Sequence, residues 1–147
     1  MKFFTDRDLG NIFPKALKKA GLDVEKLEDH FEPNTHDDIW LPEVGRRGWI
    51  AVSANYKIYY SPNERDAMFR AGTRLFIVIG KAPFPELADN FVACIHKIEK
   101  FVKANPPPFI ARIYRPPAEE IRRGSRKSGK IELWLSYDGW IKKVSSR

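Results

Sequence analysis

A carboxylate directly follows the first apolar segment of the chain. Residues 3–5 read Phe-Phe-Thr, and Asp6 comes next, with Asp8 two positions further on. In a parallel α/β sheet, ligands bind at the carboxyl ends of the strands. If further oxygen atoms converge on Asp6, the group formed would suit a hard divalent cation.

Asp37 is a second carboxylate that the sequence directs toward the same region. Trp40, Leu41 and Val44 follow it at offsets of three, four and seven, which are the positions that share one face of a helix. We therefore expect Asp37 to point with them, at the edge of the sheet. A lone carboxylate there is costly unless it is paired or bound to a metal. Asp6 is the expected neighbour, and a divalent cation would remove the repulsion between the two.

Further oxygen atoms would come from the ends of the second and third strands. Asn55 follows the third strand, and its amide oxygen could bind a cation without adding charge. Glu28 and Asp29 end the second strand and could add carboxylate oxygens. Asp8 and Asp38 could help to orient the ligands rather than bind the ion themselves.

These acids also have a structural interpretation. Thr35 and Asp38 have the spacing of a helix capping box, which is a sufficient reason for Asp38. Aspartates at strand ends and in first helical turns commonly cap helices and suit turns. Spacing alone therefore leaves two interpretations open, a metal site and a set of local caps.

The elements that would position these residues alternate between strand and helix patterns. Strands are predicted at residues 2–5, 23–27, 49–53, 74–79 and 109–114. Helices are predicted at residues 11–20, from 35 to about 45–48, from 61 onward, and at 85–104. Pro42 is expected to kink or split the second of these helices. Repeated β-α-β units indicate an α/β fold with a mostly parallel sheet and helices on both faces.

The chain after residue 116 has a different composition. Basic residues among Gly and Ser predict a flexible linker, formed by Arg122, Arg123, Arg126, Lys127 and Lys130. Residues 130–135 and 140–144 flank Ser136-Tyr137-Asp138-Gly139, which predicts a β-hairpin with an Asp-Gly turn. We therefore divide the chain into a domain at residues 1–116 and an extension at residues 117–147.

Composition and charge restrict the class of protein. The formal charge is +7, which favours a polyanionic partner such as nucleic acid but also fits a merely soluble protein. The single cysteine, Cys94, excludes an internal disulfide and a Cys/His zinc cluster. The longest apolar run, residues 75–79, is too short to span a bilayer, and no secretory h-region follows Met1. We expect a cytoplasmic protein with no membrane segment.

Four segments together form a recognisable pattern: FTDRDL at residues 4–9, DHF at 29–31, THDDIWLPEVGRRGW at 35–49 and PFIARIYR at 108–115. In these segments the chain, from about residue 3 to 115, resembles the PIN-like nuclease domains of VapC-type toxins. The third segment is the most specific, because its order and spacing are hard to match by chance. The resemblance implies a three-layer α/β/α sandwich and metal-dependent cleavage of RNA, often within a toxin–antitoxin pair.

The resemblance also implies roles for individual residues. The family's first acid falls on Asp6, and the acid at the start of the following helix falls on Asp37. The acid after the third strand falls on Asn55, where the sequence departs from the family pattern. An amide can hold a metal, but it cannot take a proton from water.

The resemblance further implies a mechanism. Mg²⁺ or Mn²⁺ on Asp6, Asp37 and Asn55 would polarise the scissile phosphate and acidify the attacking water. Lys57, Arg46 and Arg47 could contact RNA phosphates. Cations are also favoured at a helix C-terminus, which is a structural alternative for the two arginines.

Three hypotheses follow. The first is an active endoribonuclease, a toxin of a type II pair that is restrained by a protein antitoxin. The second is a catalytically impaired PIN-like module that binds nucleic acid or protein, because Asn55 replaces the third acid. The third is a structural protein that assembles with further copies of itself through its aromatic C-terminal extension. RNA, an antitoxin and a second copy of the chain are therefore the candidate partners.

Overall fold

Six strands form one sheet in the computed structural model, which describes residues 1–124 and 128–146. The strands are β1 Lys2–Thr5, β2 Asp23–Lys26, β3 Ile50–Ser53, β4 Arg74–Ile79, β5 Phe109–Tyr114 and β6 Ile131–Ser136. Their order across the sheet is β2-β1-β3-β4-β5-β6, with β1 to β5 parallel and β6 antiparallel to β5. The predicted α/β class with a mostly parallel sheet is confirmed, and each predicted strand of the sheet agrees to within one residue at either end.

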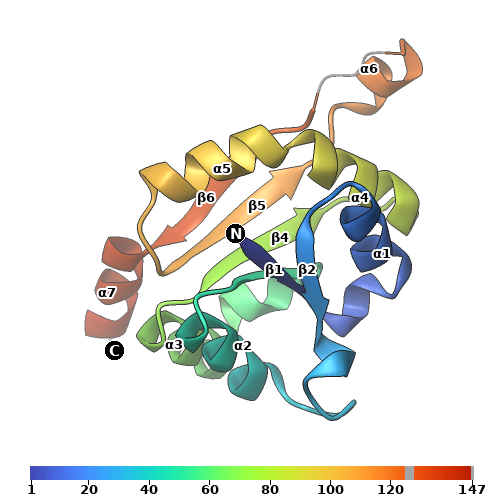
Figure 1. Ribbon diagram of the computed structural model, residues 1–147. Coiled ribbons are helices and arrows are strands. Elements are labelled where there is room, and N and C mark those ends of the chain that lie inside the picture. The colour runs from blue at the N-terminus through green and yellow to red at the C-terminus, as the bar shows by residue number, and fades with distance from the viewer. Residues whose placement is uncertain (125–127, 147) are drawn as a thin grey trace.

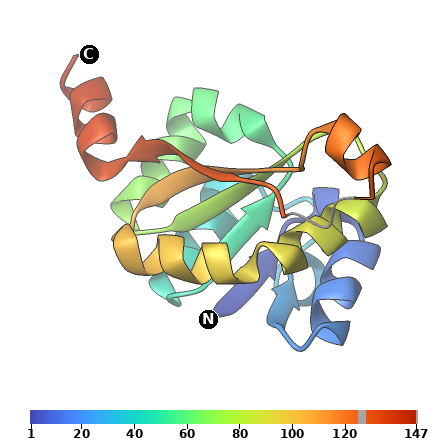
Figure 2. The same ribbon diagram turned by 90° about the horizontal axis from the view of Figure 1, so that it is seen from above.

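Helices cover both faces of this sheet (Figures 1 and 2). The helices are α1 Ile12–Lys19, α2 Asp37–Arg46, α3 Pro62–Arg70, α4 Phe84–Ala93, α5 Ile95–Ala104, α6 Ala118–Arg122 and α7 Tyr137–Ser145. Short 3₁₀ turns lie at η1 Arg7–Leu9, η2 Leu27–Asp29 and η3 Tyr56–Tyr60.

Two hydrophobic clusters separate the layers, one on each face of the sheet. Phe3 belongs to the cluster that includes residues of α1, α4 and α5, whereas the next residue, Phe4, belongs to the cluster that includes residues of α2, α3 and α7. Successive side chains of a strand point to opposite faces, so adjacent phenylalanines can serve both clusters. The three-layer α/β/α arrangement expected from the resemblance is thereby confirmed.

The helix predicted at residues 85–104 is instead two helices. The chain leaves helical geometry at Cys94, between α4 and α5. The break lies where α4 contacts the segment before β6, because the Asn90 carboxamide accepts from Gly129 N at 2.9 Å and donates to Tyr114 O at 3.1 Å. An unbroken apolar stripe in the sequence does not reveal this tertiary contact.

Helix α2 also differs from the prediction. It begins at Asp37 rather than Thr35, and it continues through Pro42 to Arg46 as a single helix. Thr35 does not cap it, because its Oγ1 donates to Glu32 O at 2.7 Å. The first residue of α2 is thus the candidate acid itself.

The C-terminal extension keeps its predicted antiparallel strand but not the second arm. β6 pairs with β5 through the register Ile113 to Ile131. Residues 140–144 belong to helix α7, because Ser136 Oγ accepts from Gly139 N at 3.0 Å and so caps a helix where a turn was predicted. Trp140 on that helix is buried, and its Nε1 donates to Asp66 Oδ1 at 2.8 Å.

The predicted linker is only partly described. Helix α6, Ala118–Arg122, lies within it, whereas Arg126 and Lys127 are outside the described residues. The division of the chain at residue 116 stays a prediction. Among the described residues, no helix is both long and apolar enough to cross a membrane.

The C-terminal extension contacts η3 through stacked side chains. The rings of Tyr59 and Trp134 lie parallel, with centroids 4.0 Å apart. Lys143 Nζ lies 5.3 Å from the centre of the Tyr59 ring, and the Arg112 guanidinium lies 4.4 Å from that of Trp134. Lys143, Tyr59, Trp134 and Arg112 thus form a stacked column, which joins α7, β6 and β5 to the turn that follows β3.

Close backbone packing fixes the position of α2. A Cβ atom on Gly45 would overlap Thr73 Oγ1 and would lie 3.0 Å from Ala71 O. Thr73 Oγ1 in turn donates to Leu41 O at 2.9 Å. Only glycine allows α2 to approach the α3–β4 turn this closely.

We expect Gly45→Ala to lower the free energy of unfolding by about 1–3 kcal/mol, because the added methyl group has no room. Alanine favours an exposed helix interior by about 1 kcal/mol over glycine, so the sign of the change tests the packing. Urea denaturation of the full chain measures it. Lys103→Ala, at an exposed position of α5, is the control and should change stability by less than about 0.5 kcal/mol. A Gly45→Ala protein as stable as the parent would contradict this account.

Candidate functional site

The carboxyl ends of β1 and β3 and the first turn of α2 meet around one hollow. The hollow has a volume of about 490 Å³. It is lined by Asp6, Arg7, Asp8, Asp37, Ala54 and Asn55. The structure therefore brings together Asp6, Asp37 and Asn55, the three residues that the sequence predicted to meet, and adds Asp8 to them.

Asp6 is placed by the sheet itself. Its backbone N–H donates to Val52 O at 2.9 Å, which continues the pairing of β1 with β3. The chain then turns at once, because Leu9 N donates to Asp6 O at 3.1 Å. This turn returns Asp8 to the side of the sheet where Asp6 points.

Ser53, the last residue of β3, connects two of the acids. Its Oγ donates to Asp6 Oδ2 at 2.8 Å and lies 3.4 Å from Asp8 Oδ2. Ala54 N donates to Asp8 Oδ2 at 3.2 Å, and Asn55 N donates to Ser53 Oγ at 2.9 Å. The end of β3 thus holds both carboxylates through one buried hydroxyl and one backbone N–H.

Asp37 is held by two donors. Trp40 Nε1 donates to Asp37 Oδ1 at 2.9 Å, and Asn55 Nδ2 donates to Asp37 Oδ2 at 3.2 Å. The indole comes from the same face of α2, one turn further on, which agrees with the helical spacing of the two residues. Each carboxylate oxygen therefore has a fixed partner.

The orientation of the Asn55 amide follows from its two contacts. Its Oδ1 accepts from Lys57 N at 3.2 Å and so caps η3. Because the oxygen serves a backbone N–H, the NH₂ group is the part that faces Asp37. Asn55 thus presents a donor, rather than a free oxygen, to the neighbouring carboxylate.

The electrostatics of the site are those of crowded acids. Asp6 is only 7% exposed, and its burial, followed by the charges of Asp8 and Asp37, raises its pKa to about 7 despite the hydrogen bond from Ser53. Loss of water around Asp8 raises the pKa of that carboxyl too, although Ala54 and Ser53 bond to it. In residues 1–124 and 128–146, no ion pair includes Asp6, Asp8 or Asp37.

Other residues predicted for the site lie elsewhere. Glu28 and Asp29 line a separate hollow of about 460 Å³, together with His30 and Ile39. Asp38 points toward α3, where it accepts from Asn63 Nδ2 at 2.9 Å.

The three residues predicted to contact phosphates, Arg46, Arg47 and Lys57, do not lie together. Arg46 and Arg47 lie at its C-terminal end, and the Nε of each is 3.1 Å from a Glu43 oxygen. The Arg47 guanidinium also lies 5.0 Å from the centre of the Trp49 ring. Lys57 is exposed in η3, and its backbone N–H donates to Asn55, which lines the hollow; Arg46, Arg47 and Lys57 are not among the lining residues themselves.

Sequence reasoning missed Ser53 and Arg7. The sequence contains one signal for Ser53, which is a hydroxyl residue at the end of an otherwise apolar strand. The structure shows that it is fully buried. Arg7 gave none, because a charged residue between two aspartates in a turn is ordinary on a protein surface.

The arrangement is not a ready-made cage of several acids. Across the described ranges, no group of three or more His, Cys, Asp or Glu side chains is placed to hold a metal ion. The site instead offers one pair of carboxylates, Asp6 and Asp8, with Ser53 between them, and a single acid, Asp37, on α2.

Comparison with known proteins identifies one family. A family model described as a PIN-like domain matches residues 1–80, which is more than half of the chain. No curated protein and no solved structure matches the chain. The matched residues include β1 to β4 and every residue that lines the hollow.

A raised pKa for Asp6 predicts a particular dependence of stability on pH in metal-free protein. The folded value of about 7 exceeds the ordinary 3.8, so the folded state binds the extra proton between these limits. This contribution to stability is full below about pH 4 and is lost as the pH rises through 7. Asp6→Asn should therefore raise the free energy of unfolding at about pH 8 by roughly 1–3 kcal/mol.

Urea denaturation in a chelator at about pH 5 and pH 8 measures the effect. The parent should lose stability between the two values, and Asp6→Asn should lose less. Asp38→Asn, which alters an acid outside the hollow, is the matched control. An Asp6→Asn protein with the parent's pH dependence would show that Asp6 is ionised throughout.

Proposed function

The chain belongs to the PIN-like domain family, and on that premise we propose that it is a metal-dependent endoribonuclease. The family supports a nuclease-type function. One observation favours activity in this chain: Asp6, Asp8 and Asp37 line a single hollow at the carboxyl ends of the strands, where α/β proteins bind their ligands.

The donor set fits Mg²⁺ or Mn²⁺. Mg²⁺ keeps several waters and needs only one or two protein carboxylates, so a cage of three acids is not required. The crowded acids raise the pKa of Asp6, and a cation among them would offset their repulsion. One or two of the carboxylates of Asp6, Asp8 and Asp37 would hold it. Asn55 acts on this site chiefly through its hydrogen bond to Asp37.

When bound, the ion would supply Lewis-acid stabilisation at the scissile phosphate and a more acidic water. The chain's own residues provide the positioning. Trp40 and Asn55 fix the two oxygens of Asp37, and Ala54 N fixes Asp8. A carboxylate of Asp6 or Asp8 that does not itself bind the ion could accept a proton from the attacking water. Arg7, which lines the hollow, and Lys57, which is exposed two residues after Asn55, are the cations that could contact the phosphate backbone.

RNA as the substrate and a toxin role rest on the resemblance to VapC-type domains. In such a pair a protein antitoxin would restrain the enzyme, and a second copy of the chain is a further candidate partner.

Expression of the parent should arrest growth, and expression of Asp37→Asn should not.

A second function is favoured by the Asn55 amide. Its NH₂ group already donates to Asp37, so this hydrogen bond partly compensates the negative charge that would otherwise attract a cation. On this reading the chain is an impaired PIN-like module that binds nucleic acid or protein without cleaving it.

We expect Mn²⁺ to raise the thermal midpoint of the parent, because an ion that binds only the folded state stabilises it. Asp6→Asn and Asp37→Asn should each abolish that rise and reduce cleavage of a single-stranded RNA by roughly 100-fold or more. Asp38→Asn is the matched control, because Asp38 is next in sequence but bonds to Asn63 outside the hollow.

Equal loss in Asp38→Asn would indicate general damage to α2. A parent that neither binds Mn²⁺ nor cleaves RNA would overturn the nuclease proposal. Binding of Mn²⁺ without cleavage would favour the impaired module.

Asn55→Asp separates the two functions. A carboxylate at this position adds charge and removes the donor to Asp37, so we expect Mn²⁺ affinity to rise by about tenfold and metal-free stability at about pH 8 to fall. Isothermal titration and RNA cleavage measure the outcome, with Asn55→Ala as the control that removes the donor without adding charge. Cleavage that appears only in Asn55→Asp would assign the parent to the impaired module, whereas equal cleavage in both proteins would show that the amide suffices.

A further inference from the structure

Strand β6 is an edge of the sheet, and one of its faces is open to solvent. Leu133, near the middle of β6, is 40% exposed, whereas Leu135 is 4% exposed. A shift in the β5–β6 register between Leu133 and Leu135 puts these two residues on opposite faces. Helix α5 runs beside β6 on the open side, and α7 follows at its far end (Figures 1 and 2). The open face is separated by β4 and β5 from the hollow that Asp6 lines.

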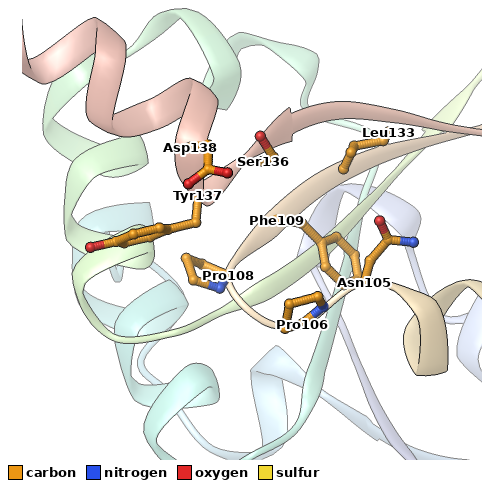
Figure 3. Close-up of a pocket in the computed structure, with 8 residues that line it drawn as sticks. All are labelled: Asn105, Pro106, Pro108, Phe109, Leu133, Ser136, Tyr137 and Asp138. Carbon is orange, nitrogen blue, oxygen red and sulfur yellow. The ribbon is translucent and has the colours of Figure 1, made fainter.

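Two hollows along this face form what we call the α5–β6 groove. The first, of about 250 Å³, has Pro106, Phe109, Leu133 and Tyr137 among its lining residues (Figure 3). The second, of about 390 Å³, has Phe101 and Ile131 in its lining. Both are lined by Asn105, so they are neighbours on this face. The apolar part of the lining consists of aliphatic, aromatic and proline side chains, and Asp138 lines the first hollow, away from the lysines of the second.

One end of the groove is positively charged. Lys97, Lys100 and Lys130 line the second hollow, and all three are exposed. Lys97 Nζ donates to Gly129 O at 2.9 Å, and Lys130 Nζ lies 3.8 Å from Glu132 Oε2. Within the described part of the chain, Lys100 takes part in no ion pair. An apolar floor beside three lysines is complementary to a ligand that is apolar on one face and acidic on its flank.

The size of the groove indicates the form of that ligand. The six residues of β6 span about 20 Å at roughly 3.3 Å per residue. A helix of about 13 residues has the same length. Helix-in-groove recognition places apolar anchors at successive turns on such a floor and acidic residues toward basic walls.

We propose that the α5–β6 groove binds an acidic amphipathic helix of a partner protein. Nucleic acid is disfavoured because a stacking platform needs aromatic faces along a basic track, whereas Phe109 is 1% exposed and Tyr137, which is 50% exposed, lines the hollow that has no lysine. A second copy of the chain is disfavoured because it carries the same charge of +7. The proposal does not depend on metal binding or RNA cleavage.

The test uses the full chain and a designed helical peptide of about 14 residues, with leucines on one face and glutamates on the flanks. A peptide with lysine in place of each glutamate and a short single-stranded RNA are the comparison probes. Fluorescence anisotropy at about 150 mM salt, where distant charges are screened, gives affinities. Amide chemical shifts locate the site.

We expect the acidic peptide to bind and to shift residues 97–105 and 131–138. Lys100→Glu should weaken binding by about tenfold, and Leu133→Asp should weaken it at least as much. Lys103→Glu is the matched control, because Lys103 is exposed one turn further along α5 but does not line the groove; it should change affinity by less than about twofold. Lys100→Glu alters an exposed residue and keeps the test valid if Leu133→Asp fails to fold.

Several results would overturn the proposal. One is the absence of saturable peptide binding up to about 1 mM, and another is equal affinity for the acidic and basic peptides. Equal weakening by Lys103→Glu, or shifts outside the groove, would show non-specific attraction. RNA binding that Lys100→Glu weakens would assign the groove to nucleic acid. A dimer in light scattering that Leu133→Asp dissolves would assign it to a second copy.

Discussion

The burial of Asp6 beside two other carboxylates is the constraint on which the candidate site depends. A buried charge without a counter-ion is unfavourable, and the described residues supply hydrogen bonds rather than cations to Asp6 and Asp8. Those hydrogen bonds come from the end of β3, so the geometry of the acids follows from the pairing of β1 with β3. The carboxyl ends of the strands thus hold acids that repel one another, and groups with perturbed pKa values are common at functional sites.

Much of this arrangement follows from local patterns. The apolar runs located the strands, and the spacing of Asp37 from Trp40 and Leu41 correctly predicted which way that acid would face. What the patterns did not contain was contact between distant segments. The hydrogen bond from Ser53 to Asp6 joins residues 47 positions apart, and the break at Cys94 lies beside Gly129, whose N–H donates to Asn90. Neither contact appears in a short window of sequence. The helix α7 was missed because Ser136 and Gly139 serve a cap as well as they serve a turn.

The amide of Asn55 shows why residue type alone does not fix a role. As a residue after the third strand it was expected to offer an oxygen to an ion. Its oxygen is instead used by the backbone of η3, which leaves its nitrogen facing Asp37. The same two contacts give Asn55 a reason to be present that does not require catalysis. The position therefore separates a cleaving enzyme from a binding module more sharply than either aspartate.

The stacked column of Tyr59 and Trp134 bears on how the chain can be shortened. The family match ends at residue 80, yet Tyr59 lies inside it and its ring partner lies far beyond it. A chain that ends after β5 would lack Trp134, which covers one face of the Tyr59 ring. It would also lack Trp140, whose indole N–H donates to Asp66. The smallest piece that folds as the whole protein does should therefore extend through α7, so sequence similarity is a poor guide to where a fragment can safely end.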